Sequence, residues 1–262
     1  MTSTFLSKVV LVTGASSGIG REVAVHFARL GAHLSICGRN AAALAETVAQ
    51  LERQRSEPGQ RFHQSVVDVT VEADVERLVK ETLAAFNGQL DVLVNNAGIL
   101  EMGSIESTDL AQYDRVMNTN VRSIYQLMML TVPSLIASKG NIVNVSSVNG
   151  LRSFPGVLAY CVSKSALDQL TACTAVELAP KGVRVNAVNP GVITTGIQKK
   201  SGLTDEQFAA FLERSKQTHA LGRPGEVDEV AGAITFLASP AASFITGACL
   251  PVDGGRHAMC PR

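Results

Sequence analysis

Short apolar runs alternate with longer amphipathic stretches from one end of the chain to the other. The apolar runs are rich in β-branched residues and mostly continuous, which is typical of strands that are covered on both faces. They predict strands at 9–12, 33–37, 66–67, 90–94, 141–146, 183–188 and 248–252. Between the strands, helical periodicity predicts helices at 19–30, 41–54, 72–87, 109–137, 157–179 and 226–238, with an additional helix at 204–219.

The repeated order of strand and then helix points to one fold class. Consecutive strand–helix units form a parallel sheet through right-handed crossovers, with helices on both faces. We therefore predict an α/β protein with a Rossmann-like, doubly wound parallel β-sheet and one domain over residues 1–262. Residues 192–220, which contain the additional helix, are predicted to be an insertion beside the substrate.

Composition and charge narrow the function classes. Hydrophobic residues make up 46% of the chain and charged residues 18%, which permits a large core. Lys and Arg together number 23, as do Asp and Glu, and this balance argues against a nucleic-acid partner. No apolar run reaches the roughly 20 residues that a membrane helix needs, so no membrane association is expected. The first residues are short and mixed in character, and they do not resemble a signal peptide.

Cysteine and histidine spacing gives no sign of a disulfide framework or a metal site. The five cysteines are an odd number, are widely spaced and include no CxxC pair. The five histidines likewise show no ligand spacing. We predict reduced thiols in a cytoplasmic protein without a bound metal.

A glycine-rich turn follows the first predicted strand. Gly14, Gly18 and Gly20 stand in a GxxxGxG pattern just before a helix. Glycines let the backbone turn tightly and approach a pyrophosphate, whose charge then meets a helix N-terminus. The turn alone could be purely structural, but its place at the first strand–helix junction favours a dinucleotide. Ser16, Ser17 and Ile19 of the same turn join the candidate cofactor contacts.

The end of the second predicted strand bears on the choice between NAD and NADP. A protein that binds the ribose 2′-hydroxyl of NAD needs an acidic residue there, and residues 35–40 contain none. Arg39 instead offers a guanidinium where a 2′-phosphate would lie. The alternatives are that Arg39 caps the next helix or simply lies in solvent. We predict NADP(H) as the cofactor.

Tyr160 and Lys164 are four residues apart within a predicted helix and therefore share one face. A tyrosine is a poor base at neutral pH, because its reference pKa is about 10. A nearby ammonium and a positive nicotinamide ring would both lower the pKa of Tyr160. Lys164 could also bind the cofactor ribose. The same spacing is common on surface helices, so the pair needs companions.

Those companions lie where other predicted strands end. Ligands of parallel sheets bind outside the carboxyl ends of the strands. Ser147 follows one strand and could donate a hydrogen bond to a carbonyl oxygen of the substrate. Small residues that leave room for the adenosine, and groups that could hold the nicotinamide carboxamide, follow two other strands: Asn95, Ala97 and Gly98, and Pro190, Gly191, Ile193 and Thr195.

Taken together, these residues resemble the short-chain dehydrogenase/reductase family of the classical type. The resemblance extends from Thr13 to residues 253–255 and lies in the order of the glycine turn, the Asn-Asn-Ala-Gly run, the serine, the Tyr-xxx-Lys pair and the Pro-Gly step. It implies a catalytic tetrad of Asn120, Ser147, Tyr160 and Lys164. Asn118 lies close by, but Asn120 before Val121 fits the family pattern better. The likeness also implies that Asp68 and Val69 contact the adenine and that Gly38-Arg39 is an NADP-preferring arrangement.

The resemblance further implies a mechanism. NADPH delivers a hydride to the carbonyl carbon, Tyr160 gives a proton to the developing alkoxide, and Ser147 steadies that oxygen. Asn120 perturbs its helix and holds a water, through which Lys164 returns a proton to Tyr160. Oxidation reverses every step. Family members usually build a dimer face from the helix at 109–137 and the helix that carries Tyr160, so a homo-oligomer, tetramer or dimer, is expected; core packing is the alternative use of those apolar residues.

The predicted substrate side is apolar. Its lining is expected from segments 99–105, 148–157 and 192–220, through Leu100, Met102, Ile105, Val148, Leu151, Phe154, Val157, Ile197, Phe208 and Phe211. This lining favours a lipophilic ketone or secondary alcohol, such as a steroid-like, 3-oxoacyl or xenobiotic carbonyl. Cytosolic NADP(H) pools favour reduction, although an oxidative alcohol dehydrogenase is an alternative. A second alternative is a catalytically idle NADP-binding sensor or interaction protein, against which the complete tetrad argues.

Overall fold

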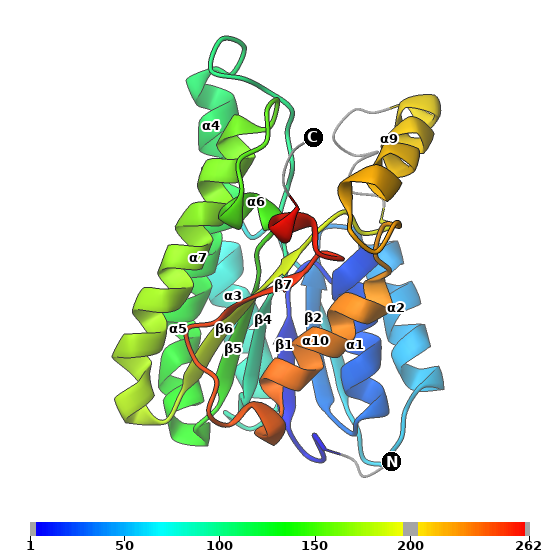
Figure 1. Cartoon of the computed structure of the whole chain (residues 1–262). Helices are drawn as coiled ribbons and strands as arrows, with labels where there is room; N and C mark the ends of the chain where they lie inside the picture. Colours follow the sequence, from blue (N-terminus) through cyan, green and yellow to red (C-terminus); the bar gives the residue numbers. More distant parts are fainter. Residues whose placement is uncertain (1–3, 196–203, 260–262) are drawn as a thin grey trace.

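The computed structural model describes residues 4–195 and 204–259. Within these ranges, seven strands form one sheet in the order β3-β2-β1-β4-β5-β6-β7 (Figure 1). The strands are β1 (Val9–Val12), β2 (His33–Gly38), β3 (Phe62–Val66), β4 (Val92–Asn95), β5 (Asn141–Val145), β6 (Arg184–Pro190) and β7 (Cys249–Val252). Every pairing between neighbours is parallel. The strand order reverses between β1 and β4, and this reversal is the switch point at which such sheets bind ligands.

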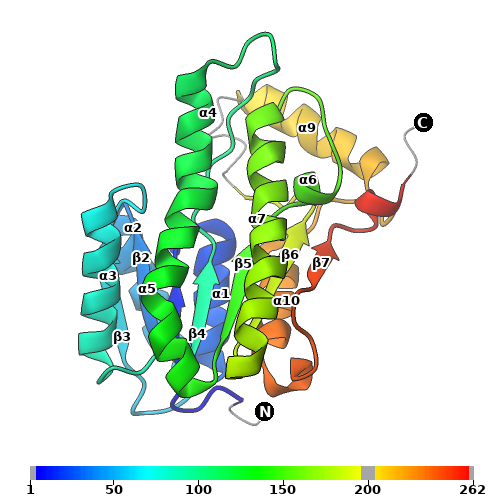
Figure 2. The same ribbon diagram turned by 90° about the vertical axis from the view of Figure 1, so that its left-hand side faces the viewer.

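Helices cover both faces of the sheet. The main ones are α1 (Gly18–Arg29), α2 (Ala41–Arg53), α3 (Glu72–Ala85), α4 (Leu110–Met117), α5 (Ser123–Ser138), α6 (Val148–Leu151), α7 (Leu158–Leu178), α9 (Asp205–Thr218) and α10 (Val227–Ala238). Buried side chains of α1, α2 and α10 form one core cluster with the sheet. Those of α3, α5 and α7 form the other, and these three helices are in front in Figure 2. The predicted Rossmann-like parallel fold is confirmed.

The continuous apolar strands follow from this layering. In β1, Val10 and Val12 belong to the core cluster under α1 and α10, whereas Val9 and Leu11 belong to the cluster under α5 and α7. Because successive side chains of a strand point to opposite faces, a strand between two helical layers needs an apolar residue at every position. Both clusters together anchor the strand ends that carry the candidate site.

The third strand corrects one prediction. We expected it at 66–67, but β3 runs from Phe62 to Val66. It is the edge strand of the sheet, and its Gln64 is exposed. An edge strand that is partly open to solvent does not need a continuous apolar run, so the sequence pattern marked only its last residue.

The predicted helix at 109–137 is continuous but not regular. A π-helical segment, Asn118–Arg122, joins α4 directly to α5. The predicted helix at 204–219 is present as α9, and it begins with a capping box. Thr204 Oγ1 accepts from the Gln207 amide at 3.2 Å, and Gln207 Oε1 accepts from the Thr204 amide at 3.0 Å. Residues 196–203, including the predicted lining residue Ile197, lie outside the described residues. In the ranges described, no helix is long and apolar enough to cross a membrane.

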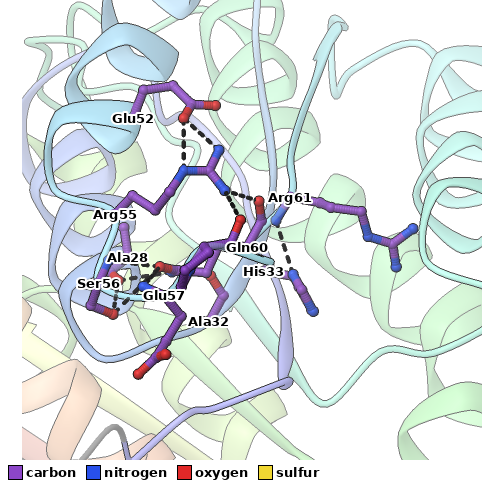
Figure 3. A network of polar contacts seen from close by, with 10 residues as sticks. Ala28, Ala32, His33, Glu52, Arg55, Ser56, Glu57, Gln60 and Arg61 are labelled. Atoms are coloured by element: carbon purple, nitrogen blue, oxygen red, sulfur yellow. Dashed lines mark hydrogen bonds and ion pairs between the residues drawn. The ribbon is translucent and has the colours of Figure 1, made fainter.

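A hydrogen-bonded cluster centred on Gln60 lies at the amino ends of β2 and β3 (Figure 3). The Gln60 side-chain amide donates to the carbonyl oxygens of Ala28 and Ala32, both at 2.8 Å. Its oxygen accepts from the backbone amides of Ser56 at 2.8 Å and Glu57 at 2.9 Å. This side chain therefore satisfies backbone groups of the α1–β2 and α2–β3 connections at once, and it does so at the edge opposite the candidate site.

Candidate active site

The sequence-predicted site residues gather at the carboxyl edge of the sheet. This is the edge over which α4, α6 and α9 stand in Figure 1. The glycine turn follows β1, and Ser147 follows β5. Asn95 and Pro190 are the last residues of β4 and β6. The chain thus brings its separate motifs together because parallel strands all end at one edge.

The glycine turn packs tightly against the segment that follows β4. Gly14 has a φ of +65°, and a Cβ added to it would lie 2.9 Å from Ala97 Cα. A Cβ on Gly20 would lie 2.3 Å from Asn96 Nδ2. Gly18 has a φ of +58°, and its Cβ would meet only Thr195, at 3.5 Å. Two of these glycines therefore permit close packing, whereas a Cβ on Gly18 would be in ordinary contact with the loop after β6.

Hydrogen bonds hold this turn in place. Asn96 Nδ2 donates to the carbonyl oxygens of Thr13 at 2.9 Å and Gly14 at 3.1 Å. Thr13 Oγ1 in turn accepts from the backbone amides of Asn96 and Ala97, both at 3.0 Å. The Arg21 guanidinium donates to the Ser16 carbonyl oxygen at 2.5 Å. Asn96 matches the predicted bracing of backbone by an asparagine, whereas the role of Arg21 was missed because nothing in its own neighbourhood marks it.

Arg39 lies at the end of β2, beside a cleft of about 460 Å³ that is also lined by Thr70, Gly98, Arg115 and Asn118. Its side chain is 72% exposed, and its Nη1 is 3.9 Å from Asp68 Oδ2. Arg39 is not the cap of the next helix, because Asn40 is the residue that caps α2. Among the described residues, the guanidinium is thus held by a long, exposed ion pair, which contributes little to stability.

Asn120 lies within the π-helical segment and is fully buried. Its Oδ1 accepts from the Ile99 amide at 2.9 Å. Its Nδ2 donates to the Ile99 carbonyl oxygen at 2.9 Å and to Ser163 Oγ at 3.1 Å. The helix perturbation implied for this residue is therefore present. The asparagine joins the segment after β4 to the helix that carries Tyr160.

Tyr160 and Lys164 lie on the buried face of α7, beside Ser147. The Ser147 side chain caps α6: its Oγ accepts from the Asn149 amide and donates to Asn149 Oδ1, both at 3.2 Å, and it lies near enough to Tyr160 to lower the pKa of the phenol. Lys164 Nζ lies 5.6 Å from the centre of the Tyr160 ring and donates to the Val145 carbonyl oxygen at 2.9 Å. The three side chains thus form one cluster.

Burial controls the ionisation of this cluster. In the chain without cofactor, burial raises the pKa of Tyr160 to about 12, against a smaller lowering by Ser147. The reason is that an anionic phenolate loses more by leaving water than the neighbouring groups return. The lowering expected from a positive nicotinamide ring stays a prediction. Burial also lowers the pKa of Lys164 to about 8, with the charge of Asp168 acting in the opposite direction. At neutral pH Tyr160 is therefore protonated, and most of Lys164 is charged.

The loop after β6 is supported by a histidine that the sequence did not single out. His219, at the C-terminal end of α9, accepts from the Val192 amide through Nε2 at 3.1 Å. A Cβ on Gly191 would lie 2.7 Å from the same nitrogen, so only glycine fits there. The Thr194 amide donates to the Gly225 carbonyl oxygen at 2.9 Å. These contacts fix the backbone that carries Ile193 and Thr195.

Comparison with known proteins decides the family. The family model described as Enoyl-(Acyl carrier protein) reductase matches residues 14–257. Cyclopentanol dehydrogenase of Comamonas sp. is 39% identical over 249 residues, which cover 95% of this chain and 96% of that protein. The chain belongs to the short-chain dehydrogenase/reductase family. The family resemblance expected from the sequence is confirmed.

Solved structures of this family superpose closely on the chain. A short-chain dehydrogenase/reductase of unknown function from Caenorhabditis elegans, solved with its cofactor, has a TM-score of 0.90 and 35% identity, and the match covers 98% of this chain and 97% of that one. Carveol dehydrogenase from Mycobacterium avium, in complex with NAD, has a TM-score of 0.91 and 26% identity, covering 98% and 100%. Short-chain dehydrogenases/reductases are oxidoreductases that bind a nicotinamide cofactor.

In this family member, two of the three segments predicted to line the substrate side lie next to each other. The Gly103 amide donates to the Gly156 carbonyl oxygen at 2.8 Å, and the Leu158 amide donates to the Gly103 carbonyl oxygen at 3.0 Å. The predicted lining residues divide by burial. Val148 and Val157 are buried, Leu100, Phe154, Phe208 and Phe211 are half-buried, and Met102, Ile105 and Leu151 are exposed.

One group of possible metal ligands lies away from this edge. His26 Nε2 is 2.7 Å from Asp228 Oδ1 and 3.6 Å from Glu22 Oε1, which joins α1 to α10. Arg29 Nη1 approaches the same glutamate oxygen at 3.9 Å. A hydrogen-bonded ion pair accounts for this geometry, and the absence of a metal site stays a prediction.

Proposed function

We propose that this short-chain dehydrogenase/reductase transfers a hydride between NADP(H) and a lipophilic ketone or secondary alcohol, with Tyr160 as the proton-transfer residue. The observation that carries the proposal is the cluster of Ser147, Tyr160 and Lys164 at the edge where the glycine turn also lies. Asn120 buttresses this cluster from the π-helical segment. A protein that only bound a dinucleotide would not need a buried phenol beside a serine and a buried lysine.

The nucleotide end of the site suits NADP(H). Gly18 has the positive φ that a tight turn needs, and no acidic residue ends β2 to hold a 2′-hydroxyl. The Arg39 guanidinium is exposed and only weakly engaged with Asp68, so it is free to bind a 2′-phosphate through two hydrogen bonds. The other proposed contacts are Gly14, Ser16, Ser17, Ile19, Gly20, Val69, Asn95, Ala97, Gly98, Pro190, Gly191, Ile193, Tyr160 and Lys164. When bound, the cofactor supplies or accepts the hydride.

The side chains of Ser147, Tyr160 and Lys164 have separate roles in proton transfer and charge stabilisation. Tyr160 is protonated at neutral pH because burial raises its pKa to about 12, and it can therefore give its proton to a carbonyl oxygen. The Ser147 hydroxyl, already oriented by capping α6, donates a hydrogen bond to the same oxygen. The Lys164 ammonium, 5.6 Å from the phenol ring, stabilises the negative charge that proton loss leaves there. Because Tyr160 is protonated before the reaction, it is ready to donate a proton, and this favours the reductive direction.

The substrate is proposed from the apolar lining and the relatives. Phe154, Phe208 and Phe211 offer half-buried apolar surface above the carboxyl edge. The names of two relatives, cyclopentanol dehydrogenase and carveol dehydrogenase, both specify an alcohol. A ketone without charged groups, including steroid-like, 3-oxoacyl and xenobiotic carbonyls, fits these surroundings best.

Exposed apolar side chains on two helices support a homo-oligomer, dimer or tetramer. Met129 on α5 is 64% exposed, and Val176 on α7 is 77% exposed; Tyr125 and Val162 add to the same two helices. Apolar surface of this kind is usually covered by a partner. Light scattering of the purified protein should give a mass that is a multiple of the 27.6 kDa chain. The cytoplasmic location stays a prediction.

The test is a steady-state assay with a panel of ketones, in which the loss of reduced-nicotinamide absorbance is followed with NADPH and, separately, with NADH. We expect at least a tenfold higher kcat/KM with NADPH. Arg39→Asp should reverse that preference, because an acid replaces the phosphate-binding cation. Arg53→Asp, at an exposed arginine of α2, is the control and should leave the preference unchanged. Absence of turnover with every ketone, or a native preference for NADH, would contradict the proposal.

A further inference from the structure

A buried carboxyl group lies directly behind the catalytic cluster. Asp168 is on α7, one helical turn after Lys164. Asn189, near the end of β6, donates through the same Nδ2 to Asp168 Oδ2 at 2.9 Å and to the Ser147 carbonyl oxygen at 2.8 Å. The aspartate is therefore linked through one amide to the backbone of the serine whose hydroxyl contacts Tyr160.

The surroundings of Asp168 are tightly packed. A Cβ added to Gly150 in α6 would lie 2.2 Å from Asp168 Oδ2 and 2.9 Å from the Lys164 carbonyl oxygen. Gly150 is thus explained by the carboxyl group that occupies its side-chain space. The second oxygen of Asp168, Oδ1, is buried and has no hydrogen bond of normal geometry within the part of the chain that the structure describes, although the Ser146 hydroxyl and the Cys249 thiol lie near the carboxyl group. A carboxyl group that is only partly satisfied costs stability.

Two titratable groups face this carboxyl group. On its own helix, the positive charge of Lys164 lowers the pKa of Asp168 against the larger effect of burial, and Asp168 raises the pKa of Lys164 in return. From β7, the Cys249 thiol has a pKa raised to about 12 by burial and by Asp168, so it is neutral. Lys164 forms no ion pair among the residues of 4–195 and 204–259. Asp168 is the acid whose charge acts on it.

We propose that Asp168 is a positioning residue of the active site, which holds the main chain of Ser147 through Asn189 and favours the charged form of Lys164 through its own negative charge. It touches neither substrate nor cofactor in this arrangement. The inference deepens the function proposed above and rests on it only where activity is the readout.

The first test is Asp168→Asn, which keeps the shape and can still accept a hydrogen bond from Asn189. Removing a negative charge lowers the pKa of every neighbouring group, so both Lys164 and Tyr160 should lose their protons more easily. We expect the alkaline limb of the kcat/KM pH profile to move to lower pH by about one pH unit. Asp114→Asn, at an exposed acid of α4, is the matched control and should leave the profile in place.

A second readout does not depend on turnover. Carbon-13 NMR of labelled lysines, with the Lys164 resonance assigned by its loss in Lys164→Met, gives the pKa of that ammonium directly. The pKa should be near 8 in the native protein and lower by about 1 in Asp168→Asn. If the native protein is inactive but this lowering is seen, the proposed function fails while the inference stands. An unchanged lysine pKa in a folded Asp168→Asn protein would overturn the inference.

A third variant separates the positioning of Ser147 from the charge effect on Lys164. It also tests the proposal if Asp168→Asn fails to fold. Asn189→Ala removes the bridge to Ser147 but leaves the charge on Asp168. We expect kcat to fall about tenfold with little change in the KM for NADPH, and the alkaline limb to stay where it is. An unchanged kcat would refute the positioning role, and a shifted limb would refute the assignment of the charge effect to Asp168.

Discussion

The amino and carboxyl edges of the sheet differ in how completely their buried polar side chains are hydrogen-bonded. At the amino edge, Gln60 is almost fully buried, and both atoms of its amide are satisfied by four backbone groups (Figure 3). At the carboxyl edge, Asp168 and Asn189 each leave one buried oxygen without a partner among the described residues, and Lys164 is buried with no carboxylate of those residues in direct contact. The amino edge has an exception of its own, Asn141 Oδ1.

This difference separates structural from functional burial. A polar group whose partners are all present stabilises the fold, because it replaces lost water contacts completely. A polar group that is only partly satisfied destabilises the fold, and it persists where its charge or position is used. The two edges should therefore respond in opposite ways to apolar substitution.

The largest change in stability is expected at the amino edge. Gln60→Leu removes four hydrogen bonds, so the carbonyl oxygens of Ala28 and Ala32 and the amides of Ser56 and Glu57 each lose the Gln60 side chain as a partner. The free energy of unfolding should fall by about 3 kcal/mol, while kcat and KM at a permissive temperature stay native. Denaturant-induced unfolding measures this, with Gln217→Leu at an exposed position of α9 as the control. A loss of kcat in the folded protein would show that the Gln60 cluster affects the candidate active site.

At the carboxyl edge we expect a smaller change in the free energy of unfolding, and one of opposite sign. Lys164→Met should abolish turnover yet stabilise the protein at pH 7 by about 2 kcal/mol. The charged lysine is penalised in the folded state, where its pKa falls from 10.5 to about 8. Lowering a pKa by 1 corresponds to about 1.4 kcal/mol, and loss of the hydrogen bond to the Val145 carbonyl oxygen offsets part of the gain.

The pH dependence of that gain sharpens the comparison. Below about pH 8 the lysine is charged in both folded and unfolded chains, so the penalty is complete. Between about 8 and 10.5 the unfolded chain holds a proton that the folded chain has released, so native stability rises with pH and the advantage of the methionine shrinks. Unfolding curves at pH 7 and at about pH 9 test this. A destabilised Lys164→Met, or a gain that does not vary with pH, would contradict the comparison.

Much of the fold could be predicted from sequence because burial leaves a periodic pattern. Strands covered on both faces are mostly apolar, and the edge strand β3, with exposed Gln64, was misplaced. Ser147, Tyr160 and Lys164 could be found because each lies at a strand end or at helical spacing. Burial of Tyr160 is a tertiary property, so its raising of the pKa of the phenol could not be predicted from the spacing of Tyr160 and Lys164.

The supporting residues could not be found in the same way. His219 acts on Val192, 27 positions away, and Asn189 acts on Asp168, 21 positions away. Neither pair has a local spacing that predicts contact. Asp168 could be recognised only as a polar residue on a helix face, and its buried position behind Ser147 depends on where β6 and α6 pack.

The central claim is that the buried phenol of Tyr160 moves the proton in the reaction. Its most direct test is kcat for ketone reduction by Tyr160→Phe, measured beside NADPH affinity by fluorescence titration and beside thermal unfolding. With Tyr125→Phe as the control, we predict a loss of kcat of about 1,000-fold, unchanged NADPH affinity and a thermal midpoint no lower than native. A Tyr160→Phe protein that folds, binds NADPH and retains native kcat would contradict the account.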